Sequence, residues 1–93
     1  MQITEPGTLW VVGTPLGNPG DLSPRARACL EGADVVLAED TKREGLACAR
    51  WGVEVRRFMS YHDHNEKEKT AAVLEMLREG KNLALISDAG MPV

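Results

Sequence analysis

The chain has 93 residues, of which 43% are hydrophobic and 27% are charged, and its net charge at pH 7 is −3. This length and composition predict one ordinary globular domain, and no apolar run approaches the roughly 20 residues that a membrane-spanning helix needs. The negative charge gives no general support for nucleic-acid binding, which requires a local cluster of Arg and Lys.

The N-terminus and the cysteines bear on the location of the protein. Residues 1–5 lack the basic and apolar regions of a signal peptide. Cys29 and Cys48 are the only cysteines and lie far apart, which is typical of a protein from a reducing compartment. Their spacing also does not match a metal-binding motif. We therefore expect a cytoplasmic protein with no metal site and no membrane segment.

The first two predicted elements are a strand and a helix. Segment 9–12 is apolar at successive positions, as a strand buried on both faces of a parallel sheet requires. Ser23 is the expected N-cap of the helix, Pro24 its first residue, and Gly32 lies just past its end. Segment 34–38 then repeats the pattern of a buried strand.

The second helix and third strand follow. Thr41 and Glu44 have the spacing of a capping box, which predicts a helix to about residue 50 that Trp51-Gly52 ends. Segment 53–58 mixes apolar and charged residues and predicts an edge or partly covered strand.

A third helix and a fourth strand complete the pattern. Asn65 and Glu68 repeat the capping-box spacing, Gly80 ends the helix, and 82–86 is again a buried strand. The apolar stripe of this helix is expected at Thr70, Val73, Leu74 and Leu77. The fold class is therefore α/β, an open parallel four-stranded sheet with three crossover helices. Ligands of such sheets bind beyond the carboxyl ends of the strands, which places functional residues at 13–21, 39–41, 59–65 and 87–93.

The first of these loops, 13–21, is rich in glycine and proline. Its spacing matches neither GxGxxG nor the P-loop, and Pro15 and Pro19 remove amides that a phosphate cradle needs. We expect it to fit a bulky substrate or the edge of a cofactor. A plain connection from strand to helix is the alternative.

The next two loops carry ionisable groups. Glu39 and Asp40 resemble the carboxylates that bind a ribose hydroxyl in dinucleotide folds, although a cap for the following helix is the favoured interpretation of this short acidic turn. His62 or His64 can act as a general base or hydrogen-bond a polar substrate; a polar loop leading into an Asn65 cap is the alternative.

The last loop, 87–93, combines small residues with the carboxylate of Asp88. A natural domain rarely ends inside such a loop, so we expect the chain to be the N-terminal part, residues 1–93, of a longer protein.

Four segments together resemble the tetrapyrrole methylase family of S-adenosylmethionine-dependent methyltransferases. They are Val12-Gly13-Thr14-Pro15-Leu16-Gly17-Asn18 with Gly20-Asp21, Glu39-Asp40-Thr41, Ser60-Tyr61-His62 with His64-Asn65-Glu66, and Ser87-Asp88-Ala89-Gly90 with Pro92. The third and fourth are similar to the members that methylate a ribose 2′-hydroxyl of a cytidine in small-subunit (16S) ribosomal RNA, rather than to the corrinoid-making members.

The resemblance implies two α/β domains with S-adenosylmethionine between them, and commonly a homodimer; this chain then corresponds to the first domain, and the C-terminal domain belongs to the same parent chain. It implies cofactor contacts from Asp88, Ala89, Gly90, Met91 and Pro92. The acceptor side is formed by Thr14, Pro15, Gly17, Asn18, Asp21 and Tyr61. The candidates for a general base are His62, His64, Glu39 and Asp40. Met91 stands where the family commonly has Thr, and Gly13 where it has Ala.

Two other classes of function stay open: a corrinoid-pathway methylase or dinucleotide-binding half-domain, and a non-catalytic dimerisation module. A positive patch for RNA would be formed by Arg25, Arg27, Lys42, Arg43, Arg50, Arg56 and Arg57, with further contacts from the second domain.

Overall fold

A parallel sheet with helices on both faces organises the molecule. The computed structural model describes residues 6–13, 22–62 and 66–87. Its elements in chain order are β1 (Leu9–Gly13), α1 (Pro24–Gly32), β2 (Val35–Ala38), α2 (Thr41–Trp51), β3 (Phe58–Ser60), α3 (Glu66–Arg78) and β4 (Leu83–Ser87). The strands lie in the order β1-β4-β2-β3 and all pair in parallel. The predicted α/β class, with four parallel strands and three crossover helices, is confirmed.

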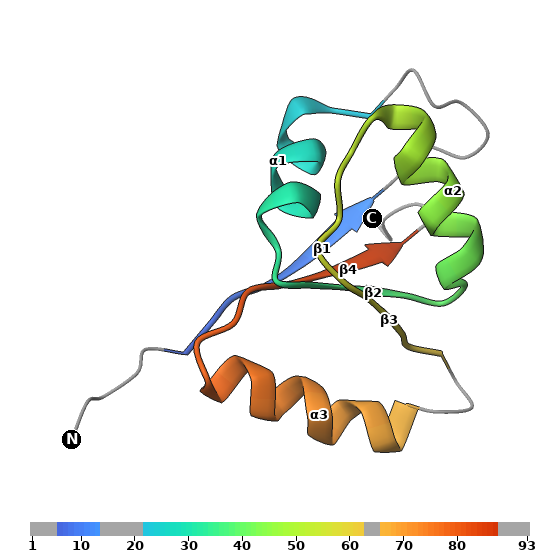
Figure 1. Ribbon diagram of the computed structural model, residues 1–93. Coiled ribbons are helices and arrows are strands. Elements are labelled where there is room, and N and C mark those ends of the chain that lie inside the picture. The colour runs from blue at the N-terminus through green and yellow to red at the C-terminus, as the bar shows by residue number, and fades with distance from the viewer. Residues whose placement is uncertain (1–5, 14–21, 63–65, 88–93) are drawn as a thin grey trace.

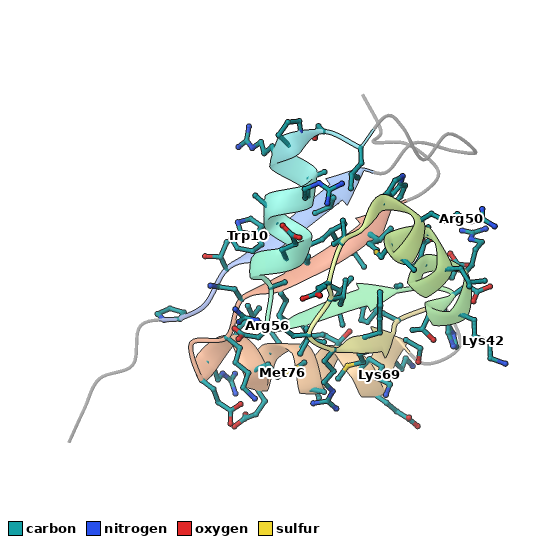
Figure 2. All side chains as sticks on the ribbon, turned by 45° about the horizontal axis from the view of Figure 1, so that its top comes forward. Trp10, Lys42, Arg50, Arg56, Lys69 and Met76 are labelled. Atoms are coloured by element: carbon teal, nitrogen blue, oxygen red, sulfur yellow. The ribbon has the colours of Figure 1, made fainter. Side chains whose placement is uncertain are left out.

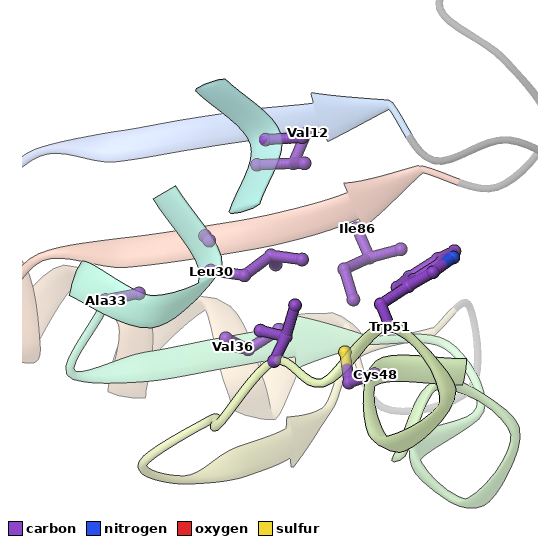
Figure 3. Packing of buried hydrophobic residues seen from close by; sticks show 10 residues of the cluster. Val12, Leu30, Ala33, Val36, Cys48, Trp51 and Ile86 are labelled. Atoms are coloured by element: carbon purple, nitrogen blue, oxygen red, sulfur yellow. The ribbon is translucent and has the colours of Figure 1, made fainter. Parts of the chain in front are cut away.

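The core has two layers, one on each side of the sheet. α1 and α2 cover one face, where Leu30, Val36 and Ile86 are buried, and Figure 3 shows these side chains packed together. α3 alone covers the other face, where Val73 and Met76 pack on Leu37 and its neighbours. In Figure 1 the sheet accordingly lies between α1 and α2 on one side and α3 on the other.

The helix ends match the predicted signals in most places. The Ser23 side chain accepts a hydrogen bond from the amide of Ala26, and Pro24 is the first residue of α1, as predicted. The C-cap of α1 is Ala33, so this helix ends one residue later than expected. Gly52 ends α2 with a φ of 71°, in the left-handed region that favours glycine. Gly80 likewise follows α3 with a φ of 87°.

The predicted capping box of α2 is wrong. Asp40, and not Thr41, is the N-cap, and its Oδ1 accepts the amide of Arg43 at 3.1 Å. The carboxylate is available one residue earlier than the hydroxyl, so Thr41 becomes the first helical residue. Glu44 turns toward the core instead of capping the helix.

The prediction that β1 is buried on both faces is also wrong. β1 is an edge strand, and the side chains of Leu9 and Val11 are 42% and 50% exposed. They point to the face that carries α3, and the helix does not extend over them, because its buried residues pack on β2 and β4. Only Val12 is buried in this strand, with Trp10 packed partly against the α1 side.

The remaining corrections concern β3 and α3. β3 is the predicted edge strand but covers only Phe58–Ser60, because residues 53–57 form an irregular connection that starts at Val53, which is buried and donates its amide to the carbonyl of Cys48. Leu74 of the expected apolar stripe is exposed, and Met76 takes the buried place beside Val73.

The exposed side of β1 and the centre of the sheet should differ in how much a truncated side chain lowers stability. Leu37→Ala is expected to lower the free energy of unfolding by about 2–5 kcal/mol, since Leu37 is fully buried between two neighbouring strands. The same change at Leu9 should cost about 1 kcal/mol or less. Urea unfolding of both variants tests this, and equal losses would contradict the arrangement of β1.

Candidate functional site

The carboxyl ends of all four strands meet at one edge of the sheet. Gly13 lies opposite Ser87 in the pairing of β1 with β4, and Ala38 lies opposite Ser60 in the pairing of β2 with β3. β4 and β2 pair so that Leu85 is opposite Leu37, which brings the two pairs of ends into line. The four segments predicted to be functional therefore start from one edge.

The ends of β2 and β3 form a topological switch point. These neighbouring strands lead to helices on opposite faces of the sheet, β2 to α2 and β3 to α3 (Figure 1). In open α/β sheets the connections diverge at such a point, and ligands bind there. The predicted residues Glu39, Asp40, Tyr61 and His62 all follow these two strand ends.

The two carboxylates after β2, Glu39 and Asp40, differ in their hydrogen bonding. Glu39 and Asp40 are both exposed at the edge. One oxygen of Asp40 is already engaged, because it accepts the Arg43 amide at the start of α2. Asp40 thus has the capping role that the sequence favoured, and Glu39 is the carboxylate that the cap does not use.

The segment after β3 is anchored to both the sheet and α3. The amide of Tyr61 donates to the carbonyl of Ala38 at 2.9 Å, which extends the ladder between β2 and β3 by one residue. The Tyr61 hydroxyl and the Thr70 hydroxyl are 3.0 Å apart and share a hydrogen bond. Tyr61 therefore fixes the path of the chain directly before His62, whose side chain is half-buried.

Several predicted site residues lie outside the described residues. These are Thr14, Pro15, Gly17, Asn18, Asp21, His64, Asp88, Ala89, Gly90, Met91 and Pro92. Their described neighbours Gly13, His62 and Ser87 lie at the same edge of the sheet.

Sequence reasoning missed a buried ionisable group on the inner side of α2. Glu44 is 5% exposed, and its Oε2 lies 3.3 Å from Nη2 of Arg43. Burial raises the pKa of Glu44 above its ordinary value of 4.5, an effect that Arg43 opposes. One turn further along α2, burial and then the charge of Glu44 raise the pKa of Cys48 to about 11.

Trp51 is a second residue that the sequence did not single out beyond its place at a helix end. Its side chain is buried beside Ile86, as Figure 3 shows, and its indole N–H has no hydrogen-bond partner among the residues that the structure describes. The signal available in the sequence was its spacing: Glu44, Cys48 and Trp51 recur at four and three residues, which places them on one helix face.

Five of the seven residues proposed for a positive patch fall into two groups, and the other two, Arg25 and Arg57, are exposed outside α2. Arg27 donates to the carbonyls of Trp51 and Gly52, at 2.5 and 3.4 Å, and so joins α1 to the end of α2. Arg56 pairs with Asp34 at 3.3 Å near the amino ends of the strands. By contrast, Lys42, Arg43 and Arg50 all lie exposed on α2; Figure 2 labels Lys42 and Arg50 on its outer side.

Within residues 6–13, 22–62 and 66–87, no group of three or more His, Cys, Asp or Glu side chains is placed to hold a metal ion. None of the helices in these ranges has the length and apolar character needed to cross a membrane.

The sequence of the chain matches the family model of the tetrapyrrole (corrin/porphyrin) methylases over residues 8–93. The chain belongs to this family. It is 45% identical over 87 residues to the ribosomal RNA small subunit methyltransferase I of Escherichia coli O157:H7, 44% to that of Pasteurella multocida and 40% to that of Thermotoga maritima. These alignments cover 94% of this chain and 30%, 31% and 39% of the respective relatives. The chain thus spans about a third of the length of these relatives.

Glu44→Gln is expected to stabilise the protein at pH 7 by on the order of 1 kcal/mol. Burial raises the pKa of this carboxyl in the folded protein. The contribution of Glu44 to stability is therefore greatest below its unfolded pKa near 4.5 and is lost as the pH rises through the higher folded pKa. The gain from Gln should therefore vanish near pH 3.5 and be larger at pH 7. Urea titrations at both pH values measure it.

Glu75→Gln is the matched control, because Glu75 is an exposed partner of Arg78 on α3. Its effect should stay within about 0.5 kcal/mol at both pH values. A Glu44→Gln protein that is less stable than wild type at pH 7 would contradict the assignment.

The two thiols should differ in reactivity. Cys48 is buried with its pKa raised to about 11, whereas Cys29 is only half-buried. At pH 8, iodoacetamide should modify Cys29 at least about tenfold faster than Cys48 in the native protein, because the thiolate is the reactive form and must be reached. Peptide mapping measures both rates, and the difference should disappear in 8 M urea.

Proposed function

We propose that this chain is the N-terminal domain of an S-adenosylmethionine-dependent methyltransferase that methylates the ribose 2′-hydroxyl of a cytidine in 16S ribosomal RNA. The observation that carries the proposal is the 45% identity, over 94% of the chain, to a protein named ribosomal RNA small subunit methyltransferase I. These relatives favour an RNA acceptor over the corrinoid, dinucleotide and dimerisation alternatives.

The proposal includes the surroundings of this domain. A C-terminal domain of the same parent chain would complete the site, which the greater length of the relatives supports. The family resemblance supports a homodimer, and a ribosomal RNA substrate supports a location in the cytoplasm.

The described border of the proposed cofactor stretch fits a closely approaching ligand. Ser87 at the end of β4 and Gly13 beside it on β1 are both small, so neither of these two described residues places a bulky side chain at the edge. S-adenosylmethionine supplies a methyl group bonded to a positively charged sulfur. Asp88, Ala89, Gly90, Met91 and Pro92 are the residues proposed to hold it, with the Asp88 carboxylate favouring the positive charge.

The acceptor side would place a ribose hydroxyl at the ends of β2 and β3. There the cofactor would supply its methyl group to the 2′-oxygen and keep the electron pair of the broken bond on its sulfur, while residues of this chain would hold the hydroxyl and one of the candidate bases would accept its proton. Holding the hydroxyl in line supplies much of the rate, so a strong base is not required. Thr14, Pro15, Gly17, Asn18 and Asp21 are the further residues proposed to shape this side.

Glu39 and His62 are the foremost of the proposed bases. Glu39 is exposed at the edge, and the bonds of Tyr61 to β2 and α3 hold the backbone that carries His62. Asp40 ranks after them because its carboxylate caps α2. His64 remains a candidate from the sequence.

Glu39→Ala and His62→Ala in the full-length enzyme should each test the role of a base. If either side chain takes the proton, its loss should lower kcat for methyl transfer to small ribosomal subunits by about 10²–10⁴ and leave the Kd for S-adenosylmethionine within a factor of two. Transfer of labelled methyl groups, with nuclease digestion to identify 2′-O-methylcytidine, measures the reaction.

Glu31→Ala, an exposed change at the far end of α1, is the control and should retain the wild-type rate. Rates like those of this control in both variants would exclude Glu39 and His62 as bases. A wild-type enzyme that leaves ribosomal RNA unmethylated would reject the proposed function itself.

A further inference from the structure

The outward face of α2 concentrates positive charge. Lys42, Leu46 and Arg50 follow one another at intervals of four residues, and Arg43 lies seven residues before Arg50, so the four share one side of the helix. All four are exposed, Leu46 by 65%. Figure 2 shows Lys42 and Arg50 extending away from the sheet on the outer side of this helix.

No carboxylate of α2 balances these cations on the outer face. Glu44 is the single acidic residue of the helix, and it is directed inward and 5% exposed. Arg43 pairs with it, yet 59% of the Arg43 side chain remains exposed. Within the described parts of the chain, neither Lys42 nor Arg50 takes part in an ion pair, whereas α3 mixes Lys and Arg with Glu on its surface.

The helix dipole does not favour two of the three cations. Lys42 and Arg43 lie in the first turn, at the positive end of the helix dipole, where cations are unfavourable. Only Arg50, in the last turn, is favourably placed. The outer face of α2 therefore presents three cations, and the exposed carboxylates of Glu39 and Asp40 lie just before its amino end.

The basic face of α2 begins next to the candidate site. α2 starts directly after Glu39 and Asp40, so the basic side begins at the edge where the strand ends meet. From Lys42 to Arg50 it extends about 12 Å along the helix axis, or roughly three nucleotide steps of a stacked strand. Arg27 and Arg56, which bind within the protein, do not compete for this role.

We infer that Lys42, Arg43 and Arg50, around Leu46, bind the phosphate backbone of the RNA strand next to the acceptor nucleotide. This inference rests on the proposed function, because it assigns a surface to the same substrate. Phosphate contacts position a nucleic acid without reading its sequence. The α2 face therefore sets the register of the strand at the edge and contributes to affinity rather than to the methyl-transfer step.

A double variant, Lys42→Ala with Arg50→Ala, tests this in the full-length enzyme with small ribosomal subunits as substrate. Arg43 is kept because its removal would leave Glu44 buried without its partner. The KM for the subunits should rise tenfold or more, while kcat at saturation and the Kd for S-adenosylmethionine change less than twofold. The slope of log K against log salt should become shallower by about 0.7–0.9 for each lost phosphate contact.

Lys67→Ala with Arg78→Ala, two exposed cations of α3, is the matched control and should leave the KM and the salt slope unchanged. The unfolding temperature of the α2 variant should stay close to that of wild type, because the loss of the unfavourable Lys42 offsets the loss of the favourable Arg50. An unchanged unfolding temperature separates weak binding from a folding defect.

The outcomes distinguish the two proposals. Normal methylation by wild type, with a KM and a salt slope in the α2 variant equal to those of the α3 control, would overturn the α2 surface and leave the proposed function intact. Failure of the wild-type enzyme to methylate the subunits would overturn both.

Discussion

The position of β4 between β1 and β2 is the constraint on which the rest of this structure depends. The last described strand enters the centre of the sheet, and a small polar network fixes its register at the amino end. The side chain of Asn82 accepts the Thr8 amide, while the Asn82 amide donates to Asp34 at 2.8 Å. Asp34 also pairs with Arg56. Side chains alternate along a strand, so a slip by one residue would turn Leu83 and Leu85 to the wrong face.

The edge that carries the candidate site follows from this register. With β4 fixed, Ser87 comes level with Gly13, and the ends of β2 and β3 align beside them. Each proposed group then needs only to follow its own strand. Residues as far apart in sequence as Glu39 and His62 reach neighbouring positions without any long loop, because their strands are hydrogen-bonded neighbours.

Local signals in the sequence predicted the order of elements well, and the errors have physical causes. The continuous apolar run identified β1 as a strand but did not show that it lies at the edge of the sheet. Whether a strand is central or at an edge depends on the strands that pair with it, and one segment of sequence does not show these. The Thr41 and Glu44 spacing matched a capping box, yet Asp40 offered a better acceptor one residue earlier. In the site, Glu39 and His62 were recognisable by chemistry, whereas the burial of Glu44 depends on how α2 packs.

The exposed side of β1 limits how this sheet can be enlarged. α1 and α2 connect strands in one direction across the sheet and lie on one face, while α3 connects in the opposite direction on the other face, so all three crossovers share one hand. Both flanks of β4 are occupied, so another parallel strand has only the outer margins available. Growth beyond β1 with the same hand would lay its helix across Leu9 and Val11, whereas growth beyond β3 would crowd a face that already has two helices.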